Sequence, residues 1–275
     1  MAREIRIPGF EITGPGLQEP PVDDLADSPG ALLYMDLSHP AAPVSGTPGT
    51  VPNLAAENAA VISATPVAPI TLANTFTSAS GKLERTAKGG LLVLPSKVND
   101  VVGQTVQAQM STGLASWART RQTDWWFLSA SVRLVRTGNA GVDQQILRLG
   151  QNTASTIVSV SEGSNGASVF GSPPPNRTSL AVPSTPTLAC LSVAAQGSGS
   201  LTSIAQSFLL GGPINATFKG KSVAYVLYFA FMDNLTLSGR SYAESRALAE
   251  ATHAAGHSVG GRWHGDTWTN PTTFP

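Results

Sequence analysis

Hydrolysis of a glycan needs two carboxylates on either side of a cleft, about 5–10 Å apart. The predicted strands between Trp125 and Phe170 contain only Asp143 and Glu162, and both lie at turns. No paired-carboxylate motif is present on these strands. The sequence therefore predicts that the chain is not an enzyme and has no catalytic residues.

Three histidines near the C-terminus raise the alternative of a metal site. His253 and His257 have i, i+4 spacing, which can place two imidazoles on one helix face, and His264 follows. Gly256 falls between the pair, where the helix is expected to end, and the Glu of a His-Glu-x-x-His motif is missing. The preferred interpretation is that these histidines are exposed at a fraying helix end.

Oxygen and sulfur ligands are also sparse. Asp143 and Asp233-Asn234 offer oxygens for calcium, but no run assembles the six or so that calcium prefers. The single cysteine, Cys190, excludes an internal disulfide and a thiolate cluster, and is expected to fill a strand as a small apolar residue. We expect no metal and no cofactor.

Exposed aromatic rings are the remaining chemical feature, because they can stack on sugars. Trp126 falls on the apolar face of a strand and is expected in the core. Trp125 points the opposite way, and together with Trp117 it is a candidate for stacking on a glycan.

Composition excludes several classes of partner. Only 12% of the 275 residues are charged, with 17 basic and 17 acidic side chains, and no basic run exceeds two residues. Nucleic acids and anionic lipids are bound mainly through clustered Lys and Arg, so neither is an expected partner. No apolar run approaches the ~20 residues that span a bilayer, so we expect no membrane insertion. The N-terminus also lacks the hydrophobic core of a signal peptide.

Strand patterns dominate the elements that must position these residues. Val223–Met232 is apolar on both faces, which predicts a central strand covered on both sides. Asp124–Arg136 alternates between apolar and polar residues, as a strand with one buried face does. Further short strands follow at intervals of about ten residues, separated by Gly, Asn and Pro turns. This pattern indicates an antiparallel sandwich or barrel.

One helix is predicted near the C-terminus. Ser241 and Glu244 have the spacing of a capping box, in which each side chain binds the backbone amide of the other residue. The helix is expected over Tyr242–His253, with Gly256 as its stop.

Both ends of the chain are expected to be extended. Residues 1–30 read as an N-terminal arm rich in Pro and Asp, residues 31–255 as the β-sandwich, and residues 256–275 as a C-terminal tail. Each extension carries apolar residues without an obvious local partner. The candidates for contacts between subunits are Ile5, Ile7, Phe10, Ile12, Trp263 and Trp268.

The order of the motifs resembles the concanavalin A-like, or laminin-G-like, family. The matching pieces are Tyr34–Asp36, Pro52–Leu54, Trp126–Leu134, Gln145–Gly150 and Leu235–Glu244, within residues 31–252. The resemblance implies an all-β fold: an antiparallel two-sheet jelly-roll sandwich, here with one short C-terminal helix and extended terminal arms.

Domains of this family occur in lectins, glycanases, adhesion proteins and the virion proteins of tailed phages. The arms, the low charge and the missing signal peptide look most like the phage group. We therefore expect a non-enzymatic structural protein of a phage-like virion, made in the host cytoplasm, as a tail, fibre, baseplate, collar or decoration component. Its partners are then other copies of itself and neighbouring virion proteins. The alternative is a carbohydrate-binding, lectin-like adhesion module that binds a host surface glycan.

Overall fold

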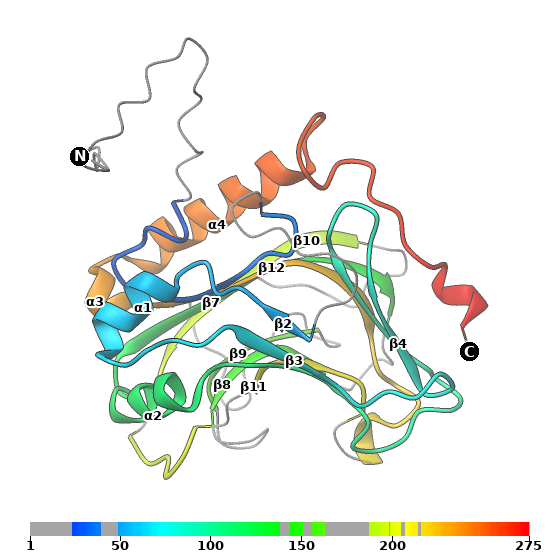
Figure 1. Cartoon of the computed structure of the whole chain (residues 1–275), viewed down its shortest axis with the longest axis horizontal. Coiled ribbons are helices and arrows are strands. Elements are labelled where there is room, and N and C mark those ends of the chain that lie inside the picture. Colours follow the sequence, from blue (N-terminus) through cyan, green and yellow to red (C-terminus); the bar gives the residue numbers. More distant parts are fainter. Residues whose placement is uncertain are drawn as a thin grey trace, which may run out of the picture.

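Two antiparallel six-stranded sheets form the body of the protein, and they stack as a β-sandwich (Figure 1). The computed structural model describes residues 24–39, 49–137, 144–150, 156–162, 187–197, 199–204, 207–213 and 216–274. The first sheet, sheet A, has the order β10-β7-β12-β5-β4, and β1 pairs with β12. Its strands are β1 (Ala31–Met35), β4 (Gly81–Arg85), β5 (Leu91–Pro95), β7 (Trp125–Arg136), β10 (Thr187–Gln196) and β12 (Ala224–Asn234).

The second sheet, sheet B, has the order β2-β3-β6-β11-β8-β9. Its strands are β2 (Thr50–Val51), β3 (Ile70–Asn74), β6 (Val106–Gln109), β8 (Gln144–Gly150), β9 (Thr156–Glu162) and β11 (Ser207–Gly211). The expectation of a two-sheet antiparallel sandwich is confirmed at this level.

Strand β12 lies in the middle of sheet A, as its sequence predicts. It pairs with β7 along one side, and with β5 and β1 along the other. All eleven of its residues are buried. Successive side chains of a strand point to opposite faces, so an apolar residue at every position requires a cover on both faces of the sheet.

The larger hydrophobic core fills the space between the two sheets. Strand β7 contributes alternate residues to it, among them Trp126, Leu128 and Val132, and all are nearly inaccessible to solvent. Sheet B faces them with residues such as Ile70 and Val106. Burial of each large apolar side chain contributes roughly 1.5–3 kcal/mol, so this layer is the main source of stability.

Two short helices close one end of that core, and the sequence analysis did not predict them. Helix α1 (Ala56–Ser63) and helix α2 (Thr112–Thr120) contact each other and lie at the same end of the sandwich (Figure 1). Ser111 caps α2 by accepting a hydrogen bond from the amide of Leu114. The expectation of one helix is therefore wrong: the described residues contain four α-helices.

Helix α4 (Tyr242–His257) lies across the outer face of sheet A and follows the four-residue helix α3 (Leu235–Ser238) (Figure 1). The capping box between Ser241 and Glu244 is formed as predicted. The helix does not end at Gly256, however. It runs to His257, and Gly256 packs so closely under the Trp263 ring that an added Cβ atom would lie 2.1 Å from it.

A second hydrophobic core lies on the outer face of sheet A. Tyr228, Phe229 and Phe231 of β12 and β7 residue Phe127 face outward, and α4 covers them with Ala249. The segment after α4 completes the cover, because Trp263 folds back over Tyr228 and Phe229 at ring-centroid distances of 5.3 and 6.0 Å. Both faces of β12 are thus covered by the chain itself.

The C-terminal segment continues along the edge of sheet A, beside β4 (Figure 1). The amide of Ala87 donates a hydrogen bond to the carbonyl of Thr267 at 3.1 Å. Thr269 donates through its amide and its hydroxyl to the two carboxylate oxygens of Glu84, at 3.0 and 2.6 Å. An edge strand that is covered in this way does not offer its polar groups to another sheet. Residues 256–274 are therefore part of the body, and their description as an extended tail is wrong.

The N-terminal boundary of the β-sandwich also differs from the predicted one. The expected arm ends at residue 30, but Leu25 is fully buried in the second core and the Ser28 hydroxyl donates to Asp233 Oδ2 at 2.9 Å. The body therefore begins at or before residue 24. Residues 1–23 lie outside the described part of the chain.

Candidate functional site: an aromatic hollow at the start of helix α4

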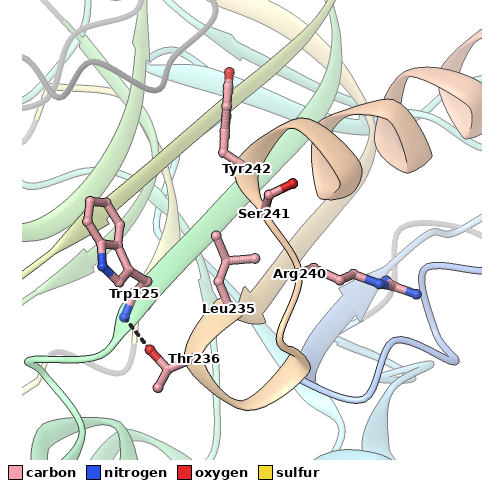
Figure 2. A pocket seen from close by; sticks show the side chains of 6 residues that line it. All are labelled: Trp125, Leu235, Thr236, Arg240, Ser241 and Tyr242. Carbon is pink, nitrogen blue, oxygen red and sulfur yellow. Dashed lines mark hydrogen bonds between the residues drawn. The ribbon is translucent and has the colours of Figure 1, made fainter.

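A small hollow of about 230 Å³ opens where the start of β7 meets the turn between α3 and α4. Figure 2 shows its lining side chains, with Trp125 on one side of Leu235 and Tyr242 rising from the start of α4. The full lining is Trp125, Leu235, Thr236, Arg240, Ser241 and Tyr242.

Trp125 is the exposed wall of this hollow. It is the first residue of β7, and the strand alternation that sends Trp126 into the core turns Trp125 to the opposite face. Its backbone amide donates to the Thr236 hydroxyl at 2.9 Å, which ties β7 to α3. Its side chain remains 40% exposed. The position of the indole is thus fixed at its backbone, while much of the ring stays open to solvent.

Tyr242 is the second aromatic wall, and it is held on both sides. Its hydroxyl lies 3.0 Å from the Ser192 hydroxyl of β10, and its ring lies 6.0 Å from that of Phe127. The capping box on Ser241 fixes the first turn of α4, from which Tyr242 projects. A side chain restrained in this way loses little conformational entropy when it contacts a ligand.

Asn234 fixes the turn that carries the remaining lining residues. Its side-chain oxygen accepts from the amide of Leu237 at 3.1 Å, and its side-chain nitrogen donates to Asp124 Oδ2 at 2.9 Å. Leu235 is only 7% exposed and forms the apolar base of the hollow. The hollow is therefore built from secondary-structure ends that are bound to each other.

Arg240 lines the hollow but directs its charge elsewhere. In Figure 2 its side chain extends away from Trp125 and Tyr242. Burial raises the pKa of the Asp233 carboxyl to about 6, while the Ser28 hydrogen bond and the positive charge of Arg240 lower it. The positive charge of Arg240 thus acts on the Asp233 carboxylate. The space between the two aromatic rings is lined by apolar and hydroxyl groups.

Trp117 and Trp125 do not form a common platform. Trp117 lies on α2, partly buried against the core between the sheets, and its ring meets the Trp126 ring edge-on at 6.1 Å. Trp125 lies on the opposite side of sheet A. The sequence analysis named both as candidates for glycan stacking, and only Trp125 lines the hollow.

Trp263 is not free to bind another subunit as predicted, and Trp268 is partly covered by the chain itself. Trp263 is 1% exposed, and its indole N–H donates to the Ser38 hydroxyl at 2.6 Å. Trp268 packs partly against the second core, with the Arg133 guanidinium 5.6 Å from its ring centre. The expectation that a neighbouring subunit covers Trp263 is wrong, because the chain's own sheet covers it.

The other candidate contact residues, Ile5, Ile7, Phe10 and Ile12, lie outside the described residues, as does Asp143. The side chain of Glu162 is likewise outside the description. The structure therefore does not place these residues relative to the hollow.

The histidine pair is buried more deeply than the sequence suggested. His253 and His257 point inward from α4 to one hydroxyl, that of Ser131 on β7. The expectation of exposed side chains at a fraying helix end is wrong for both. Within the described residues, no three His, Cys, Asp or Glu side chains come together as a metal site. Asp233 accepts from Ser28 and Asn234 caps α3, so both polar groups already have partners.

Cys190 has the character expected of a small strand residue. It lies on β10 against the second core, half-buried, with its sulfur 3.7 Å from the Ser129 hydroxyl. Burial raises the pKa of its thiol to about 11. The reactive thiolate is therefore scarce at neutral pH.

One spacing escaped the sequence analysis. Residues 256–260 read Gly-His-Ser-Val-Gly, which matches the Gly-x-Ser-x-Gly spacing of a nucleophile elbow. Such an elbow needs a strand that turns sharply into a helix. Here Ser258 follows the last residue of α4, and its hydroxyl donates to the carbonyl of Ala255 at 2.8 Å. The motif is thus a helix end in this chain.

No protein-family model and no curated protein matches this chain. Among solved structures it is similar to a Trypanosoma rangeli sialidase mutant that displays trans-sialidase activity, with 11% identity and a TM-score of 0.46, over 83% of this chain and 34% of that one. The same sialidase in complex with 2,3-difluorosialic acid gives 12% identity and a TM-score of 0.40, over 80% and 33%. Alginate lyase AlgAT5 from polysaccharide lyase family 7 has 11% sequence identity and a TM-score of 0.29, over 58% of this chain and 74% of the lyase chain.

These comparisons correct one expectation. The prediction that the chain is not an enzyme is contradicted, because the solved structures that it matches include sialidases, which are enzymes. This chain spans about a third of the sialidase chains. At these identities and TM-scores the likeness assigns no activity and no catalytic residue.

Among the described residues, no helix has the length and apolar character needed to cross a membrane.

Proposed function

We propose that this chain is a carbohydrate-binding module built on a jelly-roll sandwich of the concanavalin A-like type. The observation that carries the proposal is the hollow in which the half-exposed Trp125 ring and the restrained Tyr242 ring lie around an apolar base. One face of a sugar ring carries C–H groups that pack on an aromatic ring. Its hydroxyl edge is free to bond to groups such as the hydroxyls of Thr236 and Ser241.

The size of the hollow limits the ligand. Its volume of about 230 Å³ is below the roughly 300–1,000 Å³ of sites that enclose a drug-sized molecule. A single sugar unit, at the end of a glycan or within one, is the part that it accommodates. Because the Arg240 side chain extends away from the two rings, an uncharged sugar suits the site better than an acidic one.

Titration with a panel of neutral monosaccharides and oligosaccharides tests this proposal. Binding is followed by tryptophan fluorescence and by the NMR signals of the indole N–H groups. Trp125→Ala is expected to weaken binding roughly 5- to 100-fold, if a sugar ring gains from stacking on the indole about the 1–3 kcal/mol that a nucleobase gains on an aromatic side chain.

Leu237→Ala is the matched control for Trp125→Ala. Leu237 is also 40% exposed and lies on α3, but it does not line the hollow, so its replacement should leave the affinity unchanged. The proposal fails if no neutral glycan of the panel shifts the Trp125 signal, or if both variants bind as the wild type does.

We also propose that the module is a component of a phage-like virion that assembles through residues 1–23. Two sequence features support this: the charged fraction of 12%, and the alternation of Ile5, Ile7, Phe10 and Ile12 with polar neighbours. Leu25 and Ser28 fix the chain to the body just after this segment. Because the C-terminal segment is used to cover sheet A, the N-terminal segment is the better candidate for strand addition to a neighbour.

Deletion of residues 1–23 tests the assembly proposal. We expect the melting temperature of the purified chain to stay within about 2 °C of the full-length value, because the Pro-rich sequence of residues 1–23 predicts no regular element that packs on the body. Incorporation into particles in producing cells should be lost. A version in which Ile5, Ile7, Phe10 and Ile12 are all replaced by Ser should behave in the same way. Normal incorporation of either variant contradicts the proposal.

A further inference from the structure

Two histidines from α4 converge on one buried hydroxyl. His253 Nδ1 lies 2.8 Å and His257 Nε2 lies 3.3 Å from Ser131 Oγ, on the outer face of β7. The two imidazole rings are one helical turn apart, with their centres 4.8 Å from each other. Ser131 is fully buried. This cluster lies at the end of α4 from which the C-terminal segment returns to cover sheet A.

The hydrogen bonds of this cluster fit two neutral imidazoles. The Ser131 hydroxyl has one hydrogen, so it can donate to one ring while it accepts the N–H of the other. If both rings were protonated to imidazolium, both would donate to the same oxygen. The hydrogen of the buried serine would then need another acceptor, and an unmade buried hydrogen bond is costly. The hydrogen-bond pattern alone thus opposes protonation of the pair.

The groups that face the pair come from every element around it. Arg133 on β7 places a positive charge near both rings and lowers the pKa of both. Glu250 on α4 acts in the opposite direction on His253. Two uncharged rings pack on His257 itself: Tyr228 at 4.5 Å and Trp263 at 5.0 Å between ring centres.

Three further polar groups lie close to this cluster. The His264 side chain lies 3.3 Å from the His257 carbonyl, and the Asp266 charge acts on Tyr228. The guanidinium carbon of Arg262 lies over the Trp263 ring, 4.6 Å from the ring centre. Glu250 and Asp266 are therefore the acidic groups around the pair, and Arg133 is the cation that faces both imidazoles. Burial lowers the pKa of His253 and that of His257 more than any of these charges does.

We propose that the Ser131–His253–His257 cluster is an acid-sensitive latch that holds the end of α4 and residues 258–266 on sheet A. At neutral pH the uncharged pair packs under α4 and supports Trp263. In acid, protonation of either ring places a charge beside Arg133, and protonation of both rings breaks the shared hydrogen bonds. The end of α4 and the returning segment then leave the sheet, and the aromatic residues beneath them are exposed. The proton is the ligand of this site.

The direction of the pH effect follows from the shifts. Burial lowers the pKa of His253 and lowers that of His257 to about 3, whereas an exposed histidine has a pKa of about 6.5. A group whose pKa is lower in the closed state contributes its full stability above about pH 6.5 and loses it as the pH falls. The latch therefore weakens below pH 6.5.

Two buried carboxyl groups outside this cluster have the opposite effect on stability, because they stabilise the fold as the pH falls. Burial raises the pKa of Asp36 and raises that of Asp233 to about 6, so acid removes a charge that is costly in the folded state. Asp233 lies at the C-terminal end of β12, beside Ser28, whereas His257 packs on Tyr228 near the middle of that strand. Global stability therefore sums opposing effects, and the latch must be measured locally.

Hydrogen exchange of the full-length chain at pH 7.5 and pH 5, corrected for intrinsic exchange rates, measures the opening. Protection of residues 253–266 is expected to fall on the order of tenfold or more at pH 5, because each neutral histidine that gains a proton on opening multiplies the open population. Protection of β7 and β12 should change less. The double variant H253Q/H257Q should lose this local pH dependence, and H264Q, which changes an exposed histidine of the same segment, should keep it.

NMR titration of the wild-type histidines keeps the test independent of how the double variant packs. The ring signals of His253 and His257, assigned by comparison with H264Q and with the single variants, should both titrate below the value of about 6.5 of an exposed histidine. The latch is excluded if His253 and His257 titrate at or above pH 6.5. It is equally excluded if residues 253–266 are as protected at pH 5 as at pH 7.5.

Discussion

Trp263→Ala is expected to lower the free energy of unfolding by about 3–5 kcal/mol, as the loss of a fully buried large aromatic ring does. Trp263 is 1% exposed and packs on Tyr228, Phe229 and His257 at ring-centre distances of 5.0–6.0 Å. Its loss also leaves the Ser38 hydroxyl without the indole N–H that it accepts. In a chain of this size, such a change lowers the melting temperature on the order of 10 °C.

Thermal and denaturant unfolding of the purified chain measure this effect. Trp125→Ala is the matched control, because it removes the same side chain from a position that is 40% exposed, and its effect on stability should stay below about 1 kcal/mol. Deletion of residues 258–275 should destabilise at least as much as Trp263→Ala. A truncated chain that melts like the full-length chain would show that the C-terminal segment is not part of the fold.

The elements that could be predicted from sequence are those whose signal is local. The uninterrupted apolar pattern of β12 requires a central strand, and the Ser241–Glu244 capping box requires a helix start. Trp125 and Trp126 were assigned to opposite faces by alternation alone, and the structure places them so. Each of these inferences depends on neighbours within a few residues.

The parts that escaped prediction depend on distant contacts. Residues 256–274 show no periodic pattern of apolar residues, because they cross the end and edge of a sheet, where each side chain has different contacts. Trp263 therefore looked unpartnered, although the sequence had already shown that the second face of β12 needs a cover. Helix α2 is short and partly polar. Its signal was Ser111 as a cap followed by Leu114, Ala115 and Ala118 on one face.

The aromatic hollow could be predicted only in part. Trp125 was found by alternation, but Tyr242 joins it because α3 and α4 turn back at the end of β12, which no local pattern reveals. Arg240 could equally have faced the rings. Its direction toward Asp233 follows from burial of that carboxylate beside Ser28, a contact between residues 205 positions apart. The chemistry of the site therefore depends on tertiary structure.

Arg262→Met is the second change with a large expected effect, and its effect should depend on pH. Arg262 Nη2 lies 2.7 Å from Asp36 Oδ2, and the Asp36 side chain is fully buried. The Arg262 guanidinium lies over the Trp263 ring, and methionine keeps an apolar side chain of similar length there but removes the charge. Loss of one partner of a buried ion pair leaves the other charge unpaired, at a cost of about 3–5 kcal/mol.

Protonation of Asp36 limits this cost. Burial already raises the pKa of the Asp36 carboxyl, and Arg262 and the Ser38 hydrogen bonds oppose that rise, so removal of Arg262 raises the pKa further. A carboxyl with a raised pKa in the folded state destabilises the fold above that pKa. The penalty disappears as the pH falls toward the unfolded value of about 4. Arg262→Met should therefore cost most at pH 8 and little near pH 4.5.

Denaturant unfolding of the wild type and Arg262→Met at both pH values separates this effect from the histidine latch, because the latch is present in both proteins and cancels in the difference. Arg246→Met is the matched control: its ion pair with Glu250 is exposed, at 42% and 44%, and should contribute less than about 0.5 kcal/mol at either pH. Equal losses for Arg262→Met at pH 8 and pH 4.5 would mean that packing on Trp263, and not the charge on Asp36, is what Arg262 supplies.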